Sequence, residues 1–121
     1  MYTERHVVTL TTDGSGAATG YTPNLWGRIL GIRYLKTDFS NGVTFSVTVE
    51  STGQTVWSEA SVNASATRYP RDQVHNTSGT ALTYNGTQTV NEPIAVANDR
   101  LVITVSSGGA TKTGQVVVIV G

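Results

Sequence analysis

The chain has 121 residues, a formal net charge of zero at pH 7, and only 13% charged residues. This length suits one folded unit with its own core, and we expect a single domain over residues 1–121. The charge balance argues against nucleic-acid partners and polybasic membrane contacts, because both need a basic surface. The absence of cysteine excludes disulfides and thiol chemistry.

In chain order, the sequence predicts short strands separated by turns, with no convincing helix. The opening ten residues are charged and already alternate, so we expect a strand there and no secretion signal. Alternating or apolar runs predict strands at residues 2–12, 17–21, 27–36, 43–49, 56–62, 93–97, 100–106 and 113–120, with another short one possible at 81–84. We therefore predict an all-β fold, an antiparallel β-sandwich or jelly roll of seven to nine short strands.

The segment from residue 27 to 61 predicts three consecutive antiparallel strands with tight turns between them. An even number of residues in the second turn places Val49 opposite Val56 and leaves Trp57 and Glu59 on the outer face. An odd number would turn Glu59 into the core, where an unpaired carboxylate is costly. We choose the even register, so Trp57 becomes a candidate interface residue.

Two of the predicted strands, residues 27–36 and 113–120, are apolar on both faces. The second ends in Val116, Val117, Val118, Ile119 and Val120 in succession. One small sandwich has difficulty covering both faces of such strands. This pattern predicts a homo-oligomer.

Residues 62–91 are long, polar and poorly periodic. Loops of this length are uncommon in compact domains unless they bind something. Pro70 interrupts the segment, and Arg68, Tyr69 and Arg71 surround it. Arg and Tyr are favoured at contact hot spots, so these three residues are further candidate interface residues.

No residue pattern for catalysis, metal binding or cofactor binding is evident. His6 and His75 are far apart and lack a ligand neighbour at metal-binding spacing. No Gly-x-Ser-x-Gly elbow occurs, and Glu50 and Glu59 are expected to be solvated or interfacial. We therefore expect neither an enzyme nor a cofactor or metal site.

Four segments together resemble small structural proteins of tailed bacteriophages. They are MYTERHVVTLTTDGSGAATGYTP, GRILGIRYLKTDF, VNASATRYPRDQVHN and ANDRLVITVSSGGATKTGQVVVIVG. Such proteins belong to the head module, as capsid decoration (cement) proteins or head-fibre base components. The resemblance implies a β-rich, non-enzymatic virion component on the capsid surface, assembled in the host cytoplasm. Its implied partners are the major capsid protein and further copies of itself, most simply a trimer.

Two other functions remain open from the sequence. One is a neck, tail or head-fibre base component of the same kind of particle. The other is a carbohydrate-binding module, which would use two or more coplanar exposed aromatic side chains and polar loops. A glycan array would separate the latter from a capsid-binding protein.

Overall fold

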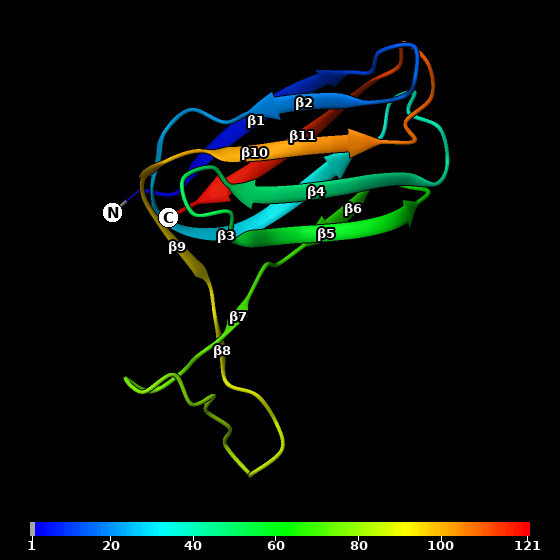
Figure 1. Cartoon of the computed structure of the whole chain (residues 1–121). Helices are drawn as coiled ribbons and strands as arrows, with labels where there is room; N and C mark the ends of the chain where they lie inside the picture. The colour runs from blue at the N-terminus through cyan, green and yellow to red at the C-terminus, as the bar shows by residue number, and fades with distance from the viewer. Residues whose placement is uncertain (1) are drawn as a thin grey trace.

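The computed structural model describes residues 2–121, and its regular structure there consists of β-strands without any helix. Consequently no described segment is a helix able to cross a membrane. The strands pack as a sandwich with an arm that projects from one edge (Figure 1). The predicted all-β, antiparallel sandwich is confirmed. Its elements are β1 (Glu4–Thr11), β2 (Ala18–Tyr21), β3 (Leu25–Leu35), β4 (Val43–Val49), β5 (Thr55–Val62), β6 (Ala66–Arg68), β7 (Asp72–Gln73), β8 (Asn91–Glu92), β9 (Ile94–Asp99), β10 (Leu101–Ser106) and β11 (Thr113–Val120).

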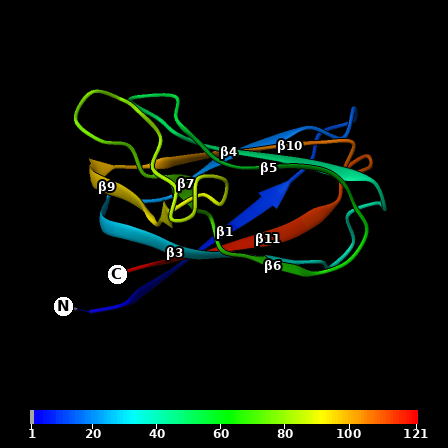
Figure 2. The same ribbon diagram turned by 90° about the horizontal axis from the view of Figure 1, so that it is seen from below.

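Two sheets form the layers of the sandwich (Figure 2). Sheet A has five strands in the order β1-β11-β3-β6, with β9 also paired to β3. Sheet B has four strands in the order β2-β10-β4-β5. Strands β7 and β8 form a separate two-stranded ribbon at the base of the arm.

The free edge of β3 is shared by two strands that are distant in sequence. Strand β9 pairs with the first half of β3, residues 25–29, and β6 pairs with residues 32–34. Together β6 and β9 act as one interrupted edge strand. The arm, defined here as residues 71–93, leaves the sandwich at this interruption (Figure 1).

The core lies between the sheets and follows the predicted alternation. Leu101, Ile103 and Val105 of β10 are fully buried, as are Val116 and Val118 of β11. Four aromatic rings fill one half of this core, and they are Tyr34, Phe39, Phe45 and Trp57. Burial of these apolar side chains is the main term that stabilises such a fold.

The expected run of three neighbouring strands over residues 27–61 is wrong in one respect. Strand β3 belongs to sheet A, whereas β4 and β5 pair in sheet B. The connection crosses between the layers because Phe39 is drawn into the core, where it is 2% exposed. Backbone hydrogen bonds from Asp38 N to Thr113 O and from Ser40 N to Gly108 O hold the crossing in place.

Candidate functional site

Trp57 belongs to the core and not to the outer surface, which corrects the predicted register. Its side chain is 7% exposed. The indole stacks on Phe45, with ring centroids 5.0 Å apart and an interplanar angle of 16°. Trp57 therefore cannot serve as the candidate interface residue that the sequence predicted.

The cause is a pair of bulges in β5. The turn has an even number of residues, as expected, but it is shorter than predicted: Val49 N donates to Gln54 O, so Val49 pairs with Gln54 and not with Val56. A register shift between Val47 and Thr48 then places Trp57 opposite Val47. A second shift restores the expected pairing of Val43 with Val62. Each bulge adds one residue to β5, so only the stretch between them faces the opposite way.

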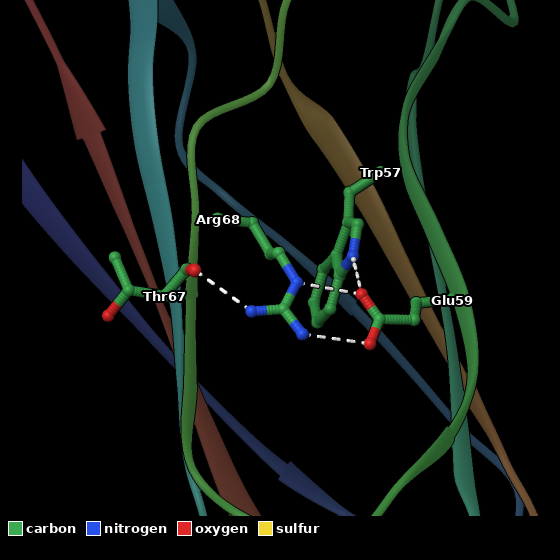
Figure 3. Close-up of polar contacts among 4 residues, drawn as sticks. All are labelled: Trp57, Glu59, Thr67 and Arg68. Atoms are coloured by element: carbon green, nitrogen blue, oxygen red, sulfur yellow. Dashed lines mark hydrogen bonds and ion pairs between the residues drawn. The ribbon is translucent and has the colours of Figure 1, made fainter.

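The reversed stretch also turns Glu59 toward the gap between the sheets, where Arg68 of β6 neutralises it (Figure 3). Arg68 Nε donates to Glu59 Oε1 at 2.8 Å, and Nη2 donates to Oε2 at 2.9 Å. Trp57 Nε1 donates to the same Oε1 at 3.2 Å. The hydrogen bond from Arg68 is the largest cause that lowers the pKa of the Glu59 carboxyl. The carboxylate is thus paired, and the expected penalty for turning it inward does not arise.

Arg68 is accordingly a structural residue. Its bidentate pair with Glu59 joins the edge of sheet A to the edge of sheet B, and its Nη1 also donates to Thr67 O at 3.0 Å. Both side chains are partly exposed, 42% for Arg68 and 34% for Glu59. The pair closes one open side of the sandwich.

Tyr69 and Arg71 lie at the base of the arm and remain accessible. Tyr69 is 68% exposed, and its ring lies over Gly31, where an added Cβ would be 3.7 Å from the ring atoms Cδ1 and Cε1. Arg71 Nη1 donates to Leu30 O at 3.4 Å, at the point of β3 that neither β6 nor β9 pairs with. Pro70 between them is buried. Of the four predicted interface residues, these two fit the prediction of an accessible surface.

A depression of about 290 Å³ lies beside Tyr69 on the outer face of sheet A. It is lined by Gly31, Arg33, Thr67, Tyr69 and Ile119. Gly31 lacks a side chain, so the depression forms between the larger neighbours. A backbone floor with aromatic, aliphatic and guanidinium walls suits an apolar side chain that carries or adjoins a negative charge.

The outward side of β11, which the sequence predicts to be apolar like its inward side, lies on the same face. Cross-strand pairing places Val7 beside Val117 and Val117 beside Arg33, and it places Arg5 beside Ile119. Val7 is 50% exposed and Leu35 is 37% exposed. Among the described residues Arg5 and Arg33 form no ion pair. The outer face of sheet A thus exposes apolar side chains such as Val7 and Leu35 beside two unpaired positive charges, while Val117 on the same face is only 5% exposed.

The arm consists of a stem and two short hairpins that meet at a three-way junction. Its stem is the β7–β8 pair, and isolated bridges His75–Ala81 and Thr83–Thr89 close the two hairpins. At the centre, Val74 N donates to Val90 O at 2.8 Å, Leu82 N to Val74 O at 2.8 Å, and Val90 N to Leu82 O at 3.2 Å. These three aliphatic residues form a closed ring of backbone hydrogen bonds, which we call the hub.

Sequence reasoning missed the hub, although a signal was present. Val74, Leu82 and Val90 recur every eight residues. Between them Asn76 and Asn85 begin turns, since each side-chain oxygen accepts backbone N–H groups two or more residues later. The two turns are too polar and the repeat too short to stand out from a loop. No residue of the arm is fully buried.

Chemical sites are not evident in the part of the chain that the structure describes. No three His, Asp or Glu side chains there come together in a way that could hold a metal ion. Comparison of the chain with protein-family models, with curated proteins and with solved structures gives no match. The exposed candidate interface residues Tyr69 and Arg71 lie where the arm meets the outer face of sheet A, which makes these two regions the candidate surface for function.

Proposed function

We propose that this chain is a virion structural protein of a tailed bacteriophage, a capsid decoration protein that binds the head as a homo-oligomer. The observation that carries the proposal is that a projecting arm without buried residues occurs together with a sheet face on which Val7, Leu35 and Tyr69 are exposed. Contacts between proteins use such surfaces, whereas an enzyme needs a convergent set of reactive groups.

The chemistry of the surface supports a protein partner over other classes. The chain has no net charge, so it has little attraction for nucleic acid. Tyr69 and Arg71 at the arm base are residue types favoured at contact hot spots. Several weak contacts of this kind act together when an oligomer binds a repetitive lattice, which makes attachment strong through avidity.

Particle labelling tests the proposal directly. The chain is expressed with an epitope tag in cells that produce the phage or prophage encoding it, and particles are purified on a density gradient and stained with immunogold. Label on the outside of heads is the expected result. Label on the neck, tail or fibre bases would move the chain to that position, and particles without label would overturn a virion role.

A double variant checks which surface attaches the protein. Tyr69→Ala with Arg71→Ala removes exposed side chains at the arm base, so the melting temperature should change little while binding to heads weakens. The matched control is Thr104→Ala, on the exposed side of β10 in sheet B. A large loss of thermal stability with head binding intact would contradict the assignment.

A further inference from the structure

One face of the arm combines aliphatic side chains with two carboxylates. Asp72 and Glu92 are directly opposite each other in the β7–β8 pair, so their side chains share one face. Side chains two residues apart along an extended strand lie on the same side, which adds Val74 and Val90 of the hub to this face. Leu82, the third hub residue, is 39% exposed.

The two carboxylates lack a positive partner among the described residues. Asp72 accepts hydrogen bonds only from neutral groups, Gln54 Nε2 at 3.1 Å and its neighbour Gln73 N at 2.8 Å. Like charges directly opposite on neighbouring strands are destabilising by themselves. Arg71 at the arm base donates to the backbone oxygens of Leu30 and Pro70 and forms no ion pair with Asp72 among the described residues. The face of the arm that holds Asp72 and Glu92 therefore carries negative charge that a cation from outside would stabilise.

The outer face of sheet A is complementary to this face of the arm in both hydrophobicity and charge. It offers exposed apolar side chains, a depression beside Tyr69, and the unpaired Arg5 and Arg33. The arm of each copy leads away from its own sandwich (Figure 1), so it does not cover the outer face of sheet A of the same copy. An apolar and acidic surface and an apolar and basic surface are thus present on every copy.

We propose that the arm of one copy docks on the outer face of sheet A of a second copy, with the hub against the apolar face and Glu92 beside Arg33. Two different surfaces meet in this contact, so it can repeat around a rotation axis, including a three-fold axis. The inference deepens the homo-oligomer of the proposed function and does not depend on where the oligomer binds a virion.

Charge reversal tests the contact in the full-length chain. Arg33→Glu or Glu92→Arg alone places like charges together and should weaken self-association about tenfold or more in sedimentation equilibrium. The double variant Arg33→Glu/Glu92→Arg should recover most of that loss. Lys112→Glu makes the same change of charge outside sheet A's outer face and should leave association unchanged. Circular dichroism confirms that each variant remains folded.

Cross-linking provides a second, independent readout. The chain has no cysteine, so single cysteines can be introduced without background. Thr67→Cys lies in the depression and Leu82→Cys lies at the hub. A mixture of the two variants should give heterodimers with a short bismaleimide, whereas Thr67→Cys mixed with Thr104→Cys should not.

The outcomes separate this inference from the proposed function. Failure of the double variant to recover association, or equal cross-linking of the control pair, overturns arm docking. A chain that stays at its protomer mass of 12.8 kDa at micromolar concentration also overturns it. Gold label on heads would leave the virion role standing in all three cases, since that label is read without reference to the arm. A monomeric chain would in addition overturn the homo-oligomer of the proposed function.

Discussion

Replacing Trp57 by alanine should remove a large part of the stability of the sandwich. The indole is 7% exposed, so nearly all of its surface leaves water on folding. An aromatic side chain of this size buries roughly 150–250 Å², which corresponds to about 4–6 kcal/mol at about 25 cal/mol per Å². Measured truncations of core tryptophan cost about 3–5 kcal/mol, in agreement with this area.

Urea denaturation followed by far-UV circular dichroism measures the effect. For a domain of this size the midpoint should fall by about 2 M, given a slope of about 1–3 kcal/mol per M. The measurement is made in the Arg33→Glu background, because self-association would add to the apparent stability.

Trp57→Phe is the matched control. It keeps a ring against Phe45 but loses the hydrogen bond from Nε1 to Glu59, so it should cost about 1–2 kcal/mol. A loss below about 1 kcal/mol for Trp57→Ala, accompanied by weaker association, would refute the reasoning. Trp57 would then belong to a subunit contact, as the sequence alone predicted.

Three further predictions follow from the same structure. Glu59→Gln should destabilise the protein most at neutral pH. The pKa of Glu59 is lowered in the folded chain, so its contribution to the free energy of unfolding is fully present above the ordinary value of 4.5 and is lost as pH falls through the lowered pKa. Thermal melts at several pH values would show this. Gly114→Ala should cost about 1–3 kcal/mol in urea melts, because its Cβ would lie 2.5 Å from Phe39 Cε2, whereas Gly14→Ala meets nothing within 4 Å and should be neutral. If arms dock between copies, amides of the arm should exchange faster in the Arg33→Glu variant than in the wild type at the same concentration; equal protection in both would show that the arm is ordered by itself.

Strands with strict alternation or a continuous apolar run could be predicted closely from the sequence. Residues 113–120 were predicted as a strand apolar on both faces, and β11 has these bounds with Val117 only 5% exposed on its outer side. Leu101, Ile103 and Val105 point inward as expected. Alternation of apolar and polar residues along one strand shows which side chains are buried, without knowledge of the neighbouring strands.

The bulges in β5 could not be predicted in the same way. Consecutive Val56 and Trp57 are both buried, which a regular strand with one solvent-facing side does not allow, and this apolar pair was the available signal. An unpaired inward Glu59 would be costly, but its carboxylate is paired with Arg68, which lies on a strand of the other sheet. Pairing across sheets depends on topology, which alternation along one strand does not contain.

For the candidate interface residues, polarity and segment length indicated exposure but not the architecture around them. Tyr69 and Arg71 were assigned to a surface, and both are exposed. Their place beside Gly31 and Leu30 follows only because β6 and β9 divide one edge of β3 between them. Contacts of this kind join residues far apart in sequence, so no local pattern predicts them.

The energetics of the arm connect the fold to its assembly. Ordering a backbone costs about 1–2 kcal/mol per residue, and the arm buries none of its side chains fully to offset that cost. Each hydrogen bond of the hub contributes about 0.5–1.5 kcal/mol net, and the opposed carboxylates of Asp72 and Glu92 subtract from the total. An arm with this balance gains most from a contact that covers the hub and supplies a cation. The outer face of sheet A, with exposed Val7 and Leu35 and the unpaired Arg33, offers both, so the element that is weakest in the isolated chain is the one that the proposed contact would stabilise most.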